Sequence, residues 1–173
     1  MLINLSVVSD AEGKAVEMVT EPELTEVKNR TGSYAVAEKK PIRWKLSNIG
    51  RNKVSVEGKS SIALLIPCDR CLSDVLTEIP IDFTHEIDLE QTEEDRREAL
   101  DEMSYLEGYQ LDVEKLLYNE ILMNWPAKIL CKPDCRGICR KCGQNLNDGN
   151  CDCDLHEYDP RMAAIKDIFN GIN

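Results

Sequence analysis

The sequence predicts an α+β protein, in which an antiparallel, β-rich and barrel-like domain with one or two helices precedes a tail of zinc-ribbon type. Apolar and polar residues alternate along much of the first half of the chain, as they do in strands with one buried face. One later stretch has apolar residues at helical spacing instead. Six of the eight cysteines lie between Cys131 and Cys153. We therefore expect a β-rich domain with a closing helix over residues 1–126, and a cysteine-rich, zinc-binding tail with a short terminal helix over residues 127–173.

The first third of the chain predicts short strands joined by polar turns. Residues 1–8 alternate in polarity and predict a strand, and a turn signal over residues 9–13 leads to a partner strand over residues 15–19. Residues 20–33 are polar and predict a loop. The next strand-like segments cover residues 34–37 and 42–46.

A β-hairpin is predicted over residues 54–66. Its first arm contains Val54 and Val56, and the Gly58-Lys59-Ser60 step supplies the turn. The second arm is apolar and ends at Pro67, so that it leads directly to Cys68.

The longest strand is predicted over residues 75–89, where the alternation is strictest. The apolar residues share one face, and acidic residues cover much of the other. Pro80 has no N–H to donate to a neighbouring strand, so it predicts an edge position or a bulge. His85 lies on the apolar face, which is typical of a histidine with a hydrogen-bond partner rather than of a metal ligand.

One or two helices are predicted in the β-rich domain, and a further short helix is predicted in the tail. Residues 90–109 are acidic and predict a short helix or a loop, after which Asp112 can cap a stronger helix that Pro126 ends. The Asp159-Pro160 step begins a short terminal helix. The apolar positions of the stronger helix are Val113, Leu116, Leu117, Ile121 and Leu122.

The net charge of −11 divides into a basic and an acidic stretch. Residues 28–59 hold nine Lys or Arg and two acidic residues, whereas residues 68–129 hold five Lys or Arg and 17 acidic residues. A basic patch can face phosphate, and an acidic patch attracts basic proteins. Alternatively, both stretches are ordinary charged faces that are exposed to water and bind no partner. The candidate nucleic-acid contacts are Lys39, Lys40, Arg43, Lys45, Arg51 and Lys53.

Two aromatic residues lie within the basic stretch. Tyr34 and Trp44 can stack on nucleic-acid bases. In a chain with only 5% aromatic residues, however, Trp44 is more typical of a core position.

The cysteine spacing predicts bound Zn²⁺. Thiolates two or three residues apart can surround one tetrahedral zinc ion, and a glycine after the second cysteine permits the tight turn that this needs. Cys139 and Cys142, followed by Gly143, are therefore the firmest ligands. Their partners are either Cys151 and Cys153, or one of these two together with Cys135.

The sequence accommodates one structural zinc ion or two. Eight cysteines divide into two sets of four, so a second set would join Cys68 and Cys71 to Cys131 and Cys135. Alternatively, Cys68 and Cys71 are a pair of reduced thiols at a strand end. A redox role would need a lowered thiol pKa, usually from a helix N-terminus, and strands are predicted on both sides of this pair. His156 is a further candidate to replace a cysteine.

Several functional classes are disfavoured. A cysteine-only cluster is typical of a closed structural site, and no catalytic triad order, phosphate loop or Rossmann fingerprint is present, which argues against an enzyme. No segment has the roughly 20 apolar residues of a membrane span, and the start lacks the basic region of a signal peptide. We expect a cytoplasmic protein, with neither a membrane nor a small-molecule substrate as partner, in which reducing conditions favour metal over disulfides.

Two motifs together resemble those of the YceD family, which is named for accumulation of large-subunit ribosomal RNA. The first is Ile-Pro-Cys68-Asp-Arg-Cys71-Leu. The second is Cys135-Arg-Gly-Ile-Cys-Arg-Lys-Cys-Gly-Gln-Asn-Leu-Asn147, with Cys-Asp-Cys after it and Trp-Pro before it. The resemblance covers nearly the whole chain. Many members have proline where this chain has Arg140, and some lack the C-terminal cysteines.

The resemblance implies a non-enzymatic factor that supports the synthesis, processing or stability of 23S rRNA. Its partners would be large-subunit rRNA or a basic large-subunit ribosomal protein, and no catalytic residues are implied. The alternative is a protein-only adaptor or chaperone for a basic ribosomal protein. A thiol redox or zinc-storage protein is a further alternative.

Overall fold

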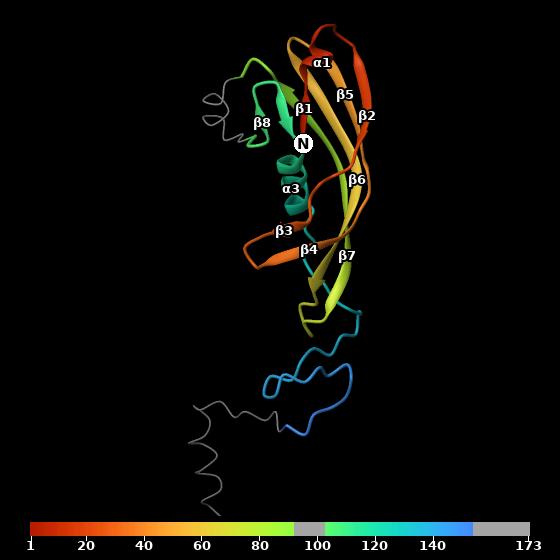
Figure 1. Cartoon of the computed structure of the whole chain (residues 1–173). Coiled ribbons are helices and arrows are strands. Elements are labelled where there is room, and N and C mark those ends of the chain that lie inside the picture. Colours follow the sequence, from red (N-terminus) through yellow and green to blue (C-terminus); the bar gives the residue numbers. More distant parts are fainter. Residues whose placement is uncertain (92–102, 154–173) are drawn as a thin grey trace, which may run out of the picture. The chain divides into compact units, whose positions relative to one another are not determined.

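The computed structural model describes residues 1–91 and 103–153, and these fall into two units (Figure 1). The first, which we call the sheet unit, consists of Met1–Pro67 and Asp74–Ile129. The second, the cysteine unit, consists of Cys68–Ser73 and the chain from Leu130 onward. The expected terminal helix at Asp159-Pro160 and the candidate ligand His156 lie outside the described residues.

The sheet unit is built on a six-stranded antiparallel sheet in which β6 is the central strand (Figure 1). β7 pairs with β6 along its whole length, and the other edge of β6 is shared by β5 and then β4. β2 pairs with β5, and β3 pairs with β4. The strands are β2 Ala15–Thr20, β3 Glu26–Lys28, β4 Ser33–Lys39, β5 Ile42–Gly50, β6 Lys53–Pro67 and β7 Asp74–Asp88.

The expected barrel is wrong, because the sheet stays open. Among the described strands, β7 pairs only with β6, and β2 pairs only with β5. No pairing therefore links β7 to β2, as closure of the sheet into a barrel through these strands would require. The antiparallel, β-rich prediction itself is confirmed. Pro80 lies on β7, an edge strand of this sheet, as its missing N–H predicts.

One face of the large sheet is buried by a helix and a small second sheet. Helix α3, Val113–Met123, packs against β7 and begins where expected, since the Asp112 carboxylate accepts hydrogen bonds from the N–H groups of Glu114 and Lys115. The small sheet has the order β1-β9-β8, with β1 Leu2–Asn4, β8 Leu106–Glu107 and β9 Gln110–Asp112. All these elements contribute to one apolar core. No helix in the described part of the chain is long and apolar enough to span a bilayer.

The predicted strand over residues 1–8 is only partly formed. β1 ends at Asn4, and the chain then turns into the short helix α1, Ser6–Ser9. The Asn4 side-chain oxygen accepts the Ser6 N–H at 2.9 Å, and the Ser9 hydroxyl donates to the Ser6 carbonyl at 2.9 Å. These local side-chain bonds compete with strand pairing, and the turn that they stabilise buries Leu5 and Val8.

The predicted hairpin turn at Gly58 is also wrong, because β6 runs through it without interruption. The chain reverses earlier, at Gly50-Arg51-Asn52, where all three residues have positive φ angles of 92°, 49° and 55°. Gly58 serves packing instead: a Cβ there would lie 2.3 Å from the Phe83 ring. The glycine thus marks a close approach between strands β6 and β7.

The structure gives the surroundings of two side chains with more than one predicted role, the buried Trp44 and the half-buried His85. Trp44 is 2% exposed, donates its indole N–H to the Thr20 hydroxyl at 2.8 Å and lies edge-on to Phe83. It is therefore a core residue and is not available to stack on bases. The His85 Nε2 lies 2.8 Å from a carboxylate oxygen of the buried Glu120 on α3, which confirms a histidine with a hydrogen-bond partner.

We predict that Gly58→Ala destabilises the sheet unit by about 1–3 kcal/mol, because the Phe83 ring must move to make room for the new methyl group. Urea unfolding followed by tryptophan fluorescence measures the effect. Gly32→Ala is the matched control, since its Cβ would meet only ordinary contacts with Tyr34 at 3.5 Å. Gly58→Ala combined with Phe83→Leu should regain part of the loss. A Gly58→Ala protein as stable as the wild type would contradict the packing role.

Candidate metal centres

The cysteine unit begins with a tight turn that closes the β6–β7 hairpin. In Cys68–Ser73, the Cys68 N–H donates to the Ser73 carbonyl at 2.8 Å, and the Leu72 N–H donates to the Cys68 carbonyl at 3.0 Å. Two backbone hydrogen bonds, both made by Cys68, therefore hold Cys68 and Cys71 on one loop. Leu72 has a φ of 62°, a left-handed conformation that is uncommon for a large side chain.

The same turn recurs around the second Cys-x-x-Cys pair. The Cys139 N–H donates to the Gln144 carbonyl at 2.8 Å, and the Gly143 N–H donates to the Cys139 carbonyl at 2.9 Å. Gly143, with a φ of 75°, occupies the position that Leu72 has in the first turn. The two loops are thus equivalent in backbone hydrogen bonding, and in each the two cysteines are held on one turn.

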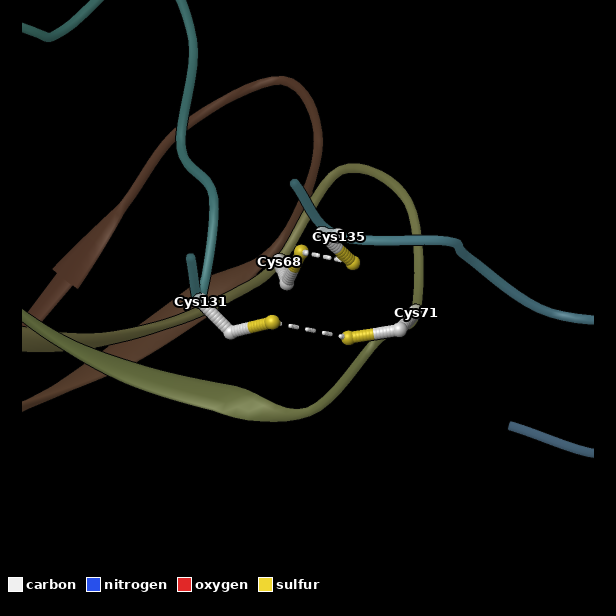
Figure 2. Close-up of side chains that lie close together, drawn as sticks. All are labelled: Cys68, Cys71, Cys131 and Cys135. Carbon is white, nitrogen blue, oxygen red and sulfur yellow. Dashed lines mark hydrogen bonds between the residues drawn. The ribbon is translucent and has the colours of Figure 1, made fainter. Parts of the chain in front are cut away.

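Four sulfur atoms meet at the first turn (Figure 2). Cys68 and Cys71 come from the hairpin loop, and Cys131 and Cys135 come from the segment after Leu130. The Sγ atoms of Cys68 and Cys135 are 3.8 Å apart, those of Cys71 and Cys131 are 3.5 Å apart, and all four lie within 4.8 Å of one another.

These sulfur distances fit a metal ion better than disulfides. A tetrahedral zinc ion with Zn–S bonds of about 2.3 Å separates its sulfur ligands by about 3.8 Å. A disulfide would need about 2.05 Å, and all eight cysteines are free thiols. The donors are chemically uniform, and thiolate sulfur is the ligand that structural zinc prefers.

A second set of four sulfur atoms forms at the second turn. Cys139 and Cys142 are joined by Cys151 and Cys153, again with all four ligand atoms within 4.8 Å. Of the two partitions that the spacing permits, the structure therefore has Cys139 and Cys142 beside Cys151 and Cys153, while Cys135 lies in the other set.

Neighbouring side chains and backbone groups hold the segments that carry the two cysteine sets in place. The Asn147 amide donates to the Cys135 sulfur at 3.3 Å, and the Arg70 guanidinium donates to the Cys135 carbonyl at 2.8 Å. Gly137, with a φ of 79°, lets the backbone pass the Arg70 carbonyl, which would be 3.1 Å from a Cβ. Ile138 pairs with Asn145 in an isolated bridge. Such outer contacts orient the ligands of a metal site.

The thiols of the first set have strongly divergent pKa values. Burial raises the pKa of Cys68, but hydrogen bonds from the backbone at Arg70, Cys71 and Cys131 outweigh it and lower the pKa to about 6. The pKa of Cys131 is raised to about 12, first by its interaction with the Cys71 sulfur and then by burial. Without a cation, some sulfurs of the set therefore keep their protons while others ionise.

The second set shows the same division. Backbone groups of Cys142 and Lys141 lower the pKa of Cys139 to about 6, whereas the Cys142 sulfur, followed by burial, raises the pKa of Cys153 to about 12. Four thiolates this close repel one another, and a divalent cation bound between them would offset much of that repulsion.

The six candidate nucleic-acid contacts are all exposed and all belong to the sheet unit. Three of them are ion-paired to acidic residues of β6 or β7. Lys40, Lys45 and Lys53 lie 2.8, 3.0 and 4.0 Å from the carboxylates of Glu78, Glu57 and Asp88, respectively. The basic and acidic stretches of the sequence are thus neighbours on one sheet face and partly neutralise each other.

The other three candidates differ in their surroundings. The Lys39 ammonium lies 3.5 Å from the Leu24 carbonyl. Arg51 belongs to the β5–β6 turn, and Arg43 projects from β5. Within the part of the chain that the structure describes, neither arginine has a carboxylate within ion-pair distance. Sequence reasoning passed over Lys59, whose Cα pairs with that of Arg43 across the sheet. Only the strand register could have shown this.

An open antiparallel sheet with a unit of paired four-cysteine clusters defines a class of protein that combines a β-rich scaffold with a potential metal-binding module. The chain belongs to the YceD family, described as large ribosomal RNA subunit accumulation protein YceD, whose family model matches residues 56–169. The matched region includes all eight cysteines.

Three relatives can be compared with the chain, and the first of them carries the family's name. The chain is 25% identical over 144 residues to the chloroplastic large ribosomal RNA subunit accumulation protein YCED homolog 1 of Arabidopsis thaliana, covering 68% of this chain and 45% of the relative. It is 27% identical over 119 residues to uncharacterized proteins of Mycobacterium bovis and Mycobacterium tuberculosis, covering 67% of this chain and 56% of each. The chain thus spans about half the length of the curated relatives that it matches. No solved structure matches it.

We predict that the purified chain binds two zinc ions, and that Cys68→Ser and Cys139→Ser each lower the content to one, because each variant removes a ligand from a different set. Mass-spectrometric metal analysis after removal of loosely bound metal measures the ratio. Ser61→Ala, on the sheet unit, is the control and should keep both ions. One zinc ion in the wild type, unaffected by Cys68→Ser, would favour a free thiol pair at Cys68 and Cys71.

Zinc binding to the metal-free chain should release protons. Cys131 and Cys153, with pKa values of about 12, are protonated at neutral pH and must lose these protons to bind metal. Affinity should therefore rise with pH and fall in acid. Titration calorimetry in buffers of different ionisation enthalpy counts the protons, and we expect at least one per zinc ion. Binding without proton release would argue against thiolate ligands.

Proposed function

We propose that this chain is a non-enzymatic factor that supports biogenesis of the large ribosomal subunit through the synthesis, processing or stability of 23S rRNA. The observation that carries the proposal is the family match over residues 56–169. The name of the plant relative, an rRNA accumulation protein, agrees with it.

In this proposal, zinc has a structural role and the sheet unit carries the binding surfaces. In the described part of the cysteine unit, the only buried residues of hydrophobic type are four cysteines, Cys68, Cys71, Cys135 and Cys139. A unit of this kind lacks an ordinary hydrophobic core, and two zinc ions with four thiolates each would cross-link it. All-sulfur donor sets are typical of closed structural sites rather than of catalytic ones.

The sheet unit offers surfaces for two kinds of partner. The exposed cations Lys39, Lys40, Arg43, Lys45, Arg51 and Lys53 favour the phosphates of large-subunit rRNA. The acidic outer residues of β7 favour a basic ribosomal protein, as does the net charge of −11. The second candidate function is therefore a protein-only adaptor for such a protein. It is favoured by the ion pairs that already neutralise Lys40, Lys45 and Lys53.

Depletion of this protein should lower the amount of 23S rRNA relative to 16S rRNA, since the proposed factor acts on the large subunit alone. Quantitative RNA analysis of depleted and complemented cells measures the ratio. An unchanged ratio, with the protein verified as absent, would contradict the proposal.

Capture of the tagged chain from lysate, before and after nuclease treatment, then separates the two candidate functions. Ribosomal proteins retained after nuclease indicate the adaptor, whereas loss of all ribosomal components indicates binding through RNA.

A further inference from the structure

The outer face of the sheet unit is hollowed where β2, β5 and β6 meet. A cavity of about 610 Å³ opens there, and its polar lining comes from Lys40, Arg43, Lys59, Ser60 and Ser61. Three cations thus line the hollow, and no carboxylate is among the described residues that line it. The lining is built mainly from strand residues and a short connection, so its shape is set by the sheet.

The strand register places two of these cations directly opposite each other. The Cα atoms of Arg43 on β5 and Lys59 on β6 are paired, and the row continues to Val19 on β2 and to Asp82 on β7. Like charges directly opposite on one sheet face repel and destabilise the pairing. The adjacent row has the usual arrangement, because Lys45 lies opposite Glu57 and forms an ion pair with it. In the Arg43–Lys59 row, Asp82 on β7 compensates Lys59 from the other side, whereas Arg43 has no carboxylate within ion-pair distance among the described residues, and an anion bound there would supply one.

The ion pairs that Lys59 and Lys40 already form are weak. Lys59 lies 3.3 Å from the Asp82 carboxylate, and Lys40 lies 2.8 Å from that of Glu78. All four side chains are at least 60% exposed, and such ion pairs contribute little because water and salt screen them. Both lysines can therefore exchange these partners for a phosphate at small cost.

The backbone around the hollow is held in place. The Ser60 hydroxyl donates to the Lys40 carbonyl at 2.8 Å, and the Lys40 N–H donates to the Ser61 carbonyl at 3.1 Å. These bonds tie the β4–β5 connection to β6, so that Lys40 stays beside Lys59. A second cavity of about 480 Å³ is also lined by Val19, Arg43 and Lys59, so the hollow continues along the sheet face, where Glu17, Lys45 and Glu57 give it mixed charge. The end of the groove at Lys40, Arg43 and Lys59 is therefore the part that suits the phosphates of a polymer.

We propose that this groove binds the phosphodiester backbone of RNA, with Arg43 and Lys59 as the principal contacts and Lys40 beside them. The inference rests on the proposed rRNA function and deepens it, because it limits the predicted RNA contacts of the basic stretch to the Arg43–Lys59 row and the neighbouring Lys40. Arg43 can donate two parallel hydrogen bonds to one phosphate, and Lys59 provides a point charge next to it. The exposed apolar side chain of Val19 borders the row on the β2 side.

The test compares two double variants of the full-length, zinc-loaded chain. Arg43→Gln with Lys59→Gln removes the two principal contacts, and Lys14→Gln with Lys28→Gln removes the same charge from ion-paired positions of the sheet unit that lie outside the groove and outside the candidate contacts. The probe is an in-vitro transcript of large-subunit rRNA, and binding is measured between about 50 and 200 mM KCl. We expect the first variant to weaken binding at least tenfold, and to reduce the slope of log K against log salt by about 1.4–1.8, as the loss of two phosphate contacts requires. The second variant should lie within twofold of the wild type.

A stability measurement separates binding from folding. Since Arg43 and Lys59 repel each other, the first variant should have a thermal midpoint equal to or above that of the wild type. Equal losses of affinity in both variants would overturn the inference in favour of diffuse attraction. Competition by polyglutamate as effective as competition by RNA would instead indicate an acidic protein as the ligand. If the wild type fails to bind the transcript, the direct RNA contact of the proposed function fails. If the wild type binds and the first variant binds equally well, this inference alone is overturned.

Discussion

The pairing between β6 and β7 is the constraint on which the other features depend. The ladder runs without a register shift from Lys53 opposite Asp88 to Pro67 opposite Asp74. Its register sets which side chains enter the core and which cations face which carboxylates on the outer face. The connection that closes this hairpin is Cys68–Ser73, so the same ladder ends in a loop that holds two cysteines of the first sulfur set.

The two units solve the problem of stability by different means. The sheet unit buries a continuous apolar core between its large sheet, α3 and the small sheet. The described part of the cysteine unit buries sulfur instead, and two backbone hydrogen bonds fix the loop at each Cys-x-x-Cys turn. A metal ion suits such a unit because four short bonds from different segments replace the apolar contacts that its Gly-, Asn- and Asp-rich sequence cannot make. The candidate surfaces for RNA or protein all lie on the sheet unit, where net charge is less informative than the row-by-row pairing of charges.

Local patterns in the sequence predicted those features that depend on near neighbours. The alternation over residues 75–89 gave the correct strand, since period-two burial needs only a one-sided sheet. Asp112 predicted the start of α3, because a capping carboxylate acts on N–H groups two and three residues away. The predictions failed where a distant partner decides the outcome. Gly58 has the appearance of a turn residue, and only the position of Phe83 on β7 shows that it makes room for a ring.

By itself, the sequence determined the antiparallel β-rich class, the capped helix and the Cys-x-x-Cys pairs, since each is encoded within a few consecutive residues. Tertiary structure alone decided that the sheet stays open, that Cys139 and Cys142 meet Cys151 and Cys153, and that Arg43 faces Lys59. The physical reason is the same in each case. Strand order, register and the meeting of distant loops depend on pairings between segments that are far apart in the chain, and the composition of either segment does not specify its partner.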